Sequence, residues 1–274
     1  MPYIKSVCRA GKTKEIAKYY TRRYHPKGEK RTPKENLTTE QQKKVNERCT
    51  VRKLTRILNA NFDETSWYVT FSYKKENRPD TEGLKRHKRE LLKQLRKCYR
   101  QQKKELKYVE TSEVGERGAV HIHMIINDID IRDIKGLWKY GFVSAKPLED
   151  TGQYRKVAEY FVKYYQKTKG TDEQIQKKAY NCSRNLVRPE PIRKIMHRER
   201  FRKELQIPKG WYLDKESVRE GITADGYEFL YYTLIRERTA YSERKKLESE
   251  YSNNKKAYLG VRQAFADMEQ YTEY

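Results

Sequence analysis

Residues 119–127 alternate between apolar and polar side chains, and no other feature of the sequence constrains the fold as strongly. Successive side chains of a β-strand point to opposite faces of its sheet. A strand here would have one apolar face, which can pack under helices, and one face that presents two imidazoles. The apolar positions are Val120, Ile122, Met124 and Ile126, and the imidazoles belong to His121 and His123.

Two imidazoles two residues apart on one strand lie close enough to bind a single metal ion. The chain has 5 histidines in all, so a pair at this spacing is unusual. The alternative is two half-buried histidines with ordinary hydrogen bonds, and the pair by itself does not separate the two interpretations. A third ligand from a carboxylate would leave positions open for phosphate oxygen and water. Glu113 is favoured because it comes just before the predicted turn at 115–118, with Glu110 and Glu116 as rivals.

The pattern of residues 154–167 predicts a helix with tyrosine and lysine on one face. Tyr160, Lys163 and Tyr164 are spaced i, i+3 and i+4, and Lys167 continues the same face. A phenol is a poor nucleophile at neutral pH because its pKa is near 10, and a nearby cation or metal ion favours the phenolate. Taken alone, the helix is more typical of an amphipathic surface helix whose tyrosines and lysines reach into solvent.

The elements expected after residue 60 follow the order β-α-β-β-α-β-α, which predicts an α+β fold with an antiparallel sheet flanked by helices. The strand at 67–73 is rich in aromatic and β-branched residues, and the helix at 81–99 has apolar residues at helical spacing. The strands are expected at 67–73, 106–111, 119–127 and 141–146, and the helices at 81–99, 133–138 and 154–167.

The terminal segments have weaker patterns. Residues 1–37 are basic and interrupted by prolines, which indicates a weakly ordered arm, and a helix follows to about residue 59. Beyond Gly170 we expect a helix at 171–180, a strand at 226–232 and a helix-prone tail from about 236. These patterns predict an arm with a helix (1–60), a core (61–170) and a C-terminal extension that binds DNA or has a structural role (171–274), with both extensions mainly helical.

The charge of the chain predicts a nucleic-acid partner. The formal net charge is +24, which repels itself unless an anionic partner offsets it. A phosphate backbone is such a partner, because it releases counterions when Lys and Arg bind. No apolar stretch is long enough to span a bilayer, and the N-terminus lacks the apolar centre of a signal peptide, so we expect a soluble cytoplasmic protein.

Three segments, in this order, resemble the HUH endonucleases, specifically the rolling-circle replication initiators of small phages and plasmids, over about residues 65–170. Tyr68–Tyr73 resembles their first motif, a strand rich in threonine and aromatic residues. His121–His123 resembles the second, His-hydrophobic-His. Tyr160–Tyr164 resembles the third, in the Tyr-x-x-Lys-Tyr form of two-tyrosine initiators, including those of microviruses and filamentous-phage relatives.

The resemblance implies a five-stranded antiparallel sheet and a metal-assisted nick that leaves a 5′-phosphotyrosine and a free 3′-OH. Tyr160 would attack first, Tyr164 would act in later cutting and rejoining, and Lys163 would orient or stabilise the reacting group. Mg²⁺ or Mn²⁺ would be held by His121, His123 and Glu113.

The partner implied is single-stranded DNA at a replication origin, for instance in a stem-loop, together with a host helicase or polymerase and no membrane. The host would be a bacterium carrying the phage or plasmid. Residues expected to contact the DNA are Lys167, Arg117 and Arg184.

Two alternatives stay open at this point. A single-strand transposase or a relaxase would use the same chemistry in another biological context. A non-enzymatic, basic nucleic-acid-binding protein would have structural histidines and salt-sensitive binding without metal-dependent cleavage.

Overall fold

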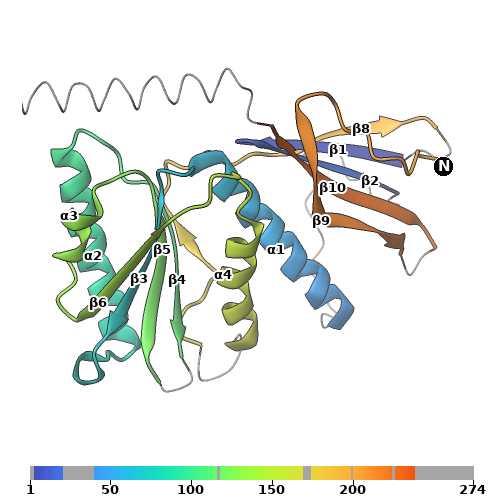
Figure 1. The fold of residues 1–274 in the computed structure, drawn as a ribbon. Helices are drawn as coiled ribbons and strands as arrows, with labels where there is room; N and C mark the ends of the chain where they lie inside the picture. The colour runs from blue at the N-terminus through green and yellow to red at the C-terminus, as the bar shows by residue number, and fades with distance from the viewer. Residues whose placement is uncertain are drawn as a thin grey trace, which may run out of the picture. The chain divides into compact units, whose positions relative to one another are not determined.

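The computed structural model describes residues 3–20, 40–115, 118–168, 174–198, 200–223 and 226–237. Within these ranges the chain forms an α+β fold with two five-stranded antiparallel sheets and four α-helices (Figure 1). The predicted fold class and the predicted five-stranded antiparallel sheet are confirmed. None of the helices in these ranges is long and apolar enough to cross a bilayer.

The central sheet contains all four strands expected between residues 61 and 170. Its order is β6-β3-β5-β4-β7, so the histidine strand lies in the middle. The fifth strand, β7, has only two residues, and the sequence did not indicate it. The bounds are β3 Trp67–Tyr73, β4 Tyr108–Val114, β5 Val120–Ile126, β6 Gly141–Pro147 and β7 Asn181–Cys182.

Helix α2 (Thr81–Gln101) covers one face of the central sheet together with the short helix α3 (Ile131–Lys135). Asp80 caps α2 by accepting a hydrogen bond from the backbone N–H of Gly83 at 2.7 Å. Its leucines pack against the apolar side of β5, as the alternation predicted. Trp138 is buried in this core as well, and the cluster includes Leu91, Leu95, Phe71, Ile122, Met124 and Ile126.

Helices α1 (Glu40–Asn61) and α4 (Arg155–Thr168) pack on the opposite face, the one that carries the histidines. Phe161 and Val162 of α4 are fully buried there. Burial of these two side chains fixes the rotation of α4 about its axis, and Tyr160 is left near the surface. The remaining core residues of this face include Leu54, Leu58, Val109, Ile125 and Ala158.

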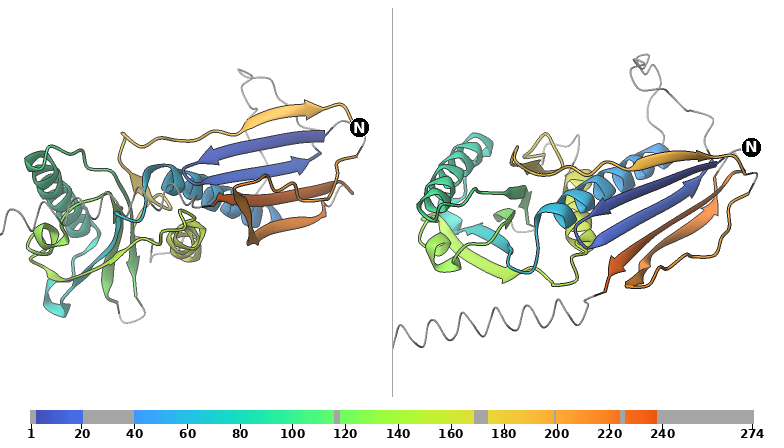
Figure 2. Two further views of the ribbon diagram at one scale, coloured as in Figure 1. Left: turned by 45° about the horizontal axis from the view of Figure 1, so that its top comes forward. Right: turned by 90° about the horizontal axis from the view of Figure 1, so that it is seen from above.

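The terminal sheet joins strands from both ends of the chain, in the order β8-β1-β2-β10-β9 (Figure 2). The expectation of a weakly ordered arm is therefore wrong for residues 3–19, which form the hairpin β1–β2. Its buried positions include small residues, Ser6, Cys8 and Ala10, so the alternation lacks the bulky apolar residues that usually reveal a strand. The bounds are β1 Tyr3–Ala10, β2 Thr13–Tyr19, β8 Ile192–Met196, β9 Trp211–Ile222 and β10 Glu228–Arg236.

The C-terminal extension is likewise not mainly helical in its described part. The predicted strand at 226–232 is confirmed as β10, whereas residues 174–180 do not form the predicted helix. The helix-prone tail lies outside the described residues from 238 onward. At the end of the described C-terminal part, the guanidinium of Arg236 lies 5.3 Å from the ring centroid of Trp211.

Asn59 links the hairpin β1–β2 to the start of α4. This buried amide donates to Thr13 Oγ1 at 3.0 Å and to Gln153 Oε1 at 3.1 Å, and it accepts from the backbone N–H of Tyr154 at 2.9 Å. Both of its polar atoms are therefore satisfied inside the protein, which a buried amide requires.

Gly11 lets the hairpin approach α1 closely, and Gly11→Ala is expected to destabilise the protein by at least about 2 kcal/mol. Gly11 has φ +55°, and a Cβ there would lie 1.9 Å from the carbonyl oxygen of Asn59. Gly210→Ala is the matched control, because Gly210 has φ +79° with open space around it, so only the backbone strain is added. Urea denaturation measures both variants, and equal losses would show that the contact with Asn59 is unimportant.

Candidate metal centre

The register of the central sheet decides which side chains share a face with the histidines. Glu113 on β4 lies directly opposite His121 on β5, so both point to the same face. Glu110 lies opposite Met124 and therefore points to the other face. Of the three candidate glutamates, the structure brings Glu113 to the histidines, while Glu116 lies outside the described residues.

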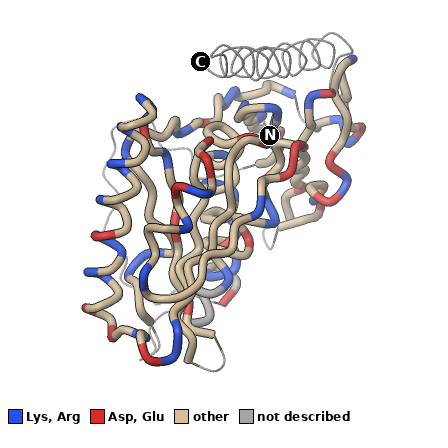
Figure 3. Tube along the Cα trace, turned by 60° about the vertical axis from the view of Figure 1, so that its left-hand side comes forward, with Lys and Arg blue, Asp and Glu red and all other residues tan. Residues whose placement is uncertain are grey.

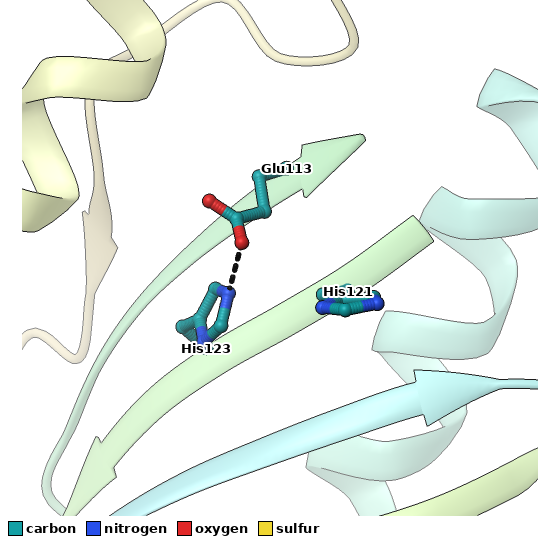
Figure 4. A group of neighbouring side chains, drawn as sticks. All are labelled: Glu113, His121 and His123. Atoms are coloured by element: carbon teal, nitrogen blue, oxygen red, sulfur yellow. Dashed lines mark hydrogen bonds and ion pairs between the residues drawn. The ribbon is translucent and has the colours of Figure 1, made fainter. Parts of the chain in front are cut away.

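Glu113, His121 and His123 form a compact cluster of potential metal ligands (Figure 4). One ligand atom from each lies within 4.8 Å of the other two, and no other such group of three occurs in the described ranges. His123 Nε2 is 2.8 Å from Glu113 Oε1. Two imidazoles and a carboxylate suit a divalent cation and leave coordination positions for other oxygen ligands, so the residues fit such an ion.

Strand β3 holds His123 in place. The ring nitrogen Nδ1 of His123 lies 3.0 Å from Tyr68 Oη and 3.1 Å from Thr70 Oγ1. These two contacts on Nδ1 fix the orientation of the ring and direct Nε2 toward Glu113. Metal-binding histidines are usually oriented in this way, by a hydrogen bond on the ring nitrogen that does not bind the metal. The sequence indicated the strand but not this role. The available signal was that Tyr68 and Thr70 alternate with the buried Val69 and Phe71.

Tyr160 reaches the cluster from α4. Its hydroxyl donates a hydrogen bond to Glu113 Oε1 at 2.8 Å and lies 3.3 Å from His123 Nε2. The rings of Tyr160 and His123 meet edge to face with centroids 5.3 Å apart. The side chain is 42% exposed, so a ligand can approach it from solvent. A phenol oxygen, two imidazoles and a carboxylate thus converge at one exposed point.

The charges of the cluster suit metal binding. Burial alone would raise the pKa of Glu113, but hydrogen bonds from His123 and Tyr160 outweigh it and the pKa is lowered. Burial and the neighbouring His123 lower the pKa of His121. Ionised carboxylate and neutral imidazole are the forms that bind metal ions. Burial and the contact with Glu113 raise the pKa of Tyr160, so the phenol stays protonated in this arrangement.

The other residues predicted on this face of α4 are Lys163, Tyr164 and Lys167, and no described contact joins them to the cluster. Lys163 is exposed, and no hydrogen bond or ion pair between described residues joins it to the cluster. Tyr164 and Lys167 have described backbones one and two turns beyond Tyr160, and their side chains lie outside the described residues. Arg117 lies outside them entirely.

Arg184 is not brought to the cluster. Strand β7 pairs Asn181 with Glu110 and Cys182 with Val109, so the chain runs away from Glu113 along β4. Arg184 follows in that direction and is exposed. If the pairing is continued, Arg184 lies beside residue 107, six residues from Glu113 along β4. At roughly 3.3 Å per residue this is about 20 Å.

Glu110 has a different environment from Glu113. It is 2% exposed on the α2 side of the sheet. Lys88 Nζ lies 2.7 Å from its Oε2, and Asn181 donates to its Oε1 at 2.7 Å. Oε1 therefore has a hydrogen-bond donor, whereas Oε2 is held by the charge of Lys88 without a hydrogen bond, and both contacts suit a structural role.

One family model matches part of the chain. Residues 66–169, which contain the whole cluster and Tyr160, match the model of the family described as replication-associated protein ORF2/G2P. This match supports a relationship to rolling-circle replication initiators. Searches of curated proteins and of solved structures found no significant match. Lys and Arg recur along most of the described trace (Figure 3).

Proposed function

Since residues 66–169 match the replication-associated family, we propose that the chain initiates rolling-circle replication by nicking and rejoining single-stranded DNA. The observation that carries this proposal is the position of Tyr160, whose hydroxyl lies 2.8 Å from Glu113 Oε1 and 3.3 Å from His123 Nε2. A nucleophile beside a candidate metal site is what tyrosine attack on a phosphodiester needs.

In the proposed reaction the Tyr160 oxygen attacks the scissile phosphorus. The P–O3′ bond breaks, the new P–O bond joins the 5′ phosphate of the downstream strand to Tyr160, and the departing oxygen of the upstream strand takes up a proton to become a free 3′-OH. Glu113, His121 and His123 would hold Mg²⁺ or Mn²⁺, which supplies Lewis-acid polarisation of the phosphate when bound. The phenol proton, which Glu113 Oε1 accepts as a hydrogen bond in this structure, has to leave Tyr160 during the attack.

Tyr164 and Lys163 complete the proposed machinery. Tyr164 comes one helical turn after Tyr160 and would attack in the rejoining step that ends a round. Lys163 lies three residues after Tyr160, within reach of the same helix face, and its ammonium would stabilise the phenolate or the phosphate charge. The name of the matched family favours replication over transposition or plasmid mobilisation as the context.

The test is an adduct assay with single-stranded DNA from the replicon's origin region and Mn²⁺. DNA labelled at its 3′ end should become covalently attached to the protein and survive denaturation. DNA labelled at its 5′ end should release a shorter fragment that a polymerase can extend. Chelation of the metal should prevent both products, and its restoration should recover them. Salt-sensitive binding without an adduct under any of these conditions would instead support the non-enzymatic alternative.

A further inference from the structure

Phe142 is a large apolar side chain exposed on the same face of the central sheet as the candidate metal ligands. It lies on β6 directly opposite Ser72, which in turn lies opposite His121. Directly opposed residues on neighbouring strands share a face, so Phe142 points to the side that carries His121 and Glu113. Two strand spacings separate it from His121, about 10 Å.

The exposure of this ring is costly for the isolated protein. Phe142 is 68% exposed, and β6 is an edge strand, where exposed apolar side chains invite pairing with other chains. Helices α1 and α4 cover other parts of this face and leave the ring in solvent. The exposed face of this ring is therefore open to stacking by a flat ligand beside the candidate metal centre.

The surroundings of Phe142 are positively charged. Lys74 Nζ lies 5.9 Å from the centroid of the phenyl ring. Lys146 is exposed on β6, and because it is four residues from Phe142 it lies on the same face of the strand. An aromatic platform between cationic side chains is the combination that binds single-stranded nucleic acid, with bases on the ring and phosphates on the cations.

We propose that Phe142 is a stacking site for a base of the DNA strand whose phosphate lies at Glu113, His121 and His123. Lys74 and Lys146 contact phosphates on either side of that base. This inference rests on the proposed function and adds a residue that positions the substrate. The distance of about 10 Å between Phe142 and His121 corresponds to about three nucleotides of a stacked strand, at roughly 3.4 Å each. The strand would therefore run from the metal centre toward the β6 edge.

The first measurement is the binding of fluorescein-labelled oligothymidylate, about 20 nucleotides long, in buffer with chelator so that no cleavage occurs. Phe142→Ala should weaken binding by about 5- to 150-fold, the range for loss of one stacked base. Phe142→Trp should retain the affinity because it keeps a ring. Ile192→Ala is the matched control, since Ile192 is 70% exposed on β8, an edge strand of the terminal sheet, and its variant should bind normally.

The salt dependence of oligonucleotide affinity distinguishes the contribution of base stacking from that of phosphate contacts. Phe142→Ala should lower the affinity without changing the slope of log K against log salt concentration. Lys146→Ala should make that slope shallower by about 0.7, the value for one phosphate contact on a single strand. Replacement of the oligonucleotide by an abasic strand of equal length should remove the difference between the unsubstituted protein and Phe142→Ala. Thermal unfolding should be the same for both, since the replaced ring is exposed.

Two results would overturn the inference. One is equal affinity of Phe142→Ala and the unsubstituted protein for oligothymidylate, and the other is no binding by the unsubstituted protein. The adduct assay described above reports separately on the nuclease. Adduct formation with an unaffected Phe142→Ala rejects only the stacking site, whereas a clear effect of Phe142→Ala on binding without any adduct rejects only the nicking activity.

Discussion

Tyr160→Phe is expected to abolish the covalent protein–DNA adduct and to lower nicking by at least about 10³-fold, because it removes the attacking oxygen and leaves the ring in place. The loss should appear in the 3′-label assay at saturating Mn²⁺. Tyr212→Phe is a suitable control, since Tyr212 has the same 42% exposure as Tyr160 and belongs to β9.

The same variant should keep its affinity for Mn²⁺. Tyr160 and His123 both contact Oε1 of Glu113, so the phenol competes with a metal ion for that oxygen. Removal of the hydroxyl takes away one competitor, and calorimetric titration should give an affinity equal to or tighter than that of the unsubstituted protein. Full adduct formation by both Tyr160→Phe and Tyr164→Phe would show that the tyrosine assignment is wrong. Loss of adduct formation in Tyr164→Phe but not in Tyr160→Phe would show that Tyr164 attacks first.

Glu113→Gln and Glu110→Gln should have opposite effects, although they are the same substitution three residues apart. Glu113→Gln removes the negative ligand, so Mn²⁺ affinity should fall by at least about 10- to 100-fold, and adduct formation with it. Its effect on stability should be small, because an amide of the same shape can still meet His123 and Tyr160.

Glu110→Gln should leave Mn²⁺ affinity unchanged and destabilise the protein by about 3 kcal/mol. The reason is the ion pair with Lys88, whose side chain is 16% exposed, so its charge would lose its partner in a largely dry site. Calorimetric titration with Mn²⁺ measures the metal affinity of both variants, and urea denaturation measures their stability. Weakened metal binding in Glu110→Gln with normal binding in Glu113→Gln would assign the third ligand to Glu110 instead.

The sequence predicted the candidate site up to the point where register matters. The alternation around His121 and His123 predicted their common face, and the spacing of residues 154–167 predicted the helix that brings Tyr160 to the site. The choice among Glu110, Glu113 and Glu116 depends on how β4 pairs with β5, and a shift of one residue would exchange the faces of Glu110 and Glu113. Composition does not fix that register, because the turn between the strands allows several loop lengths.

The terminal sheet could not be predicted for a different reason. Its strands come from residues 3–19, 192–196 and 211–236, so the pairing is between the two ends of the chain. Local patterns carry no information on such distant partners, so β10 was predicted as a strand but not its pairing with β2, and small buried residues hide β1. The contacts of Tyr68 and Thr70 with His123 were hidden in the same way, since they depend on the pairing of β3 with β5.

The amide of Asn59 limits how short a working fragment can be. A fragment of residues 66–169 would contain every proposed ligand and both proposed nucleophiles, and it would cover the whole family match. It would also lack α1, which covers Phe161 and Val162, and it would leave the backbone N–H of Tyr154 at the start of α4 without its acceptor. Helix α4 would then be held less firmly against the sheet, and Tyr160 with it. A minimal fragment that keeps Tyr160 at the candidate metal centre should therefore begin at or before Glu40, the first residue of α1.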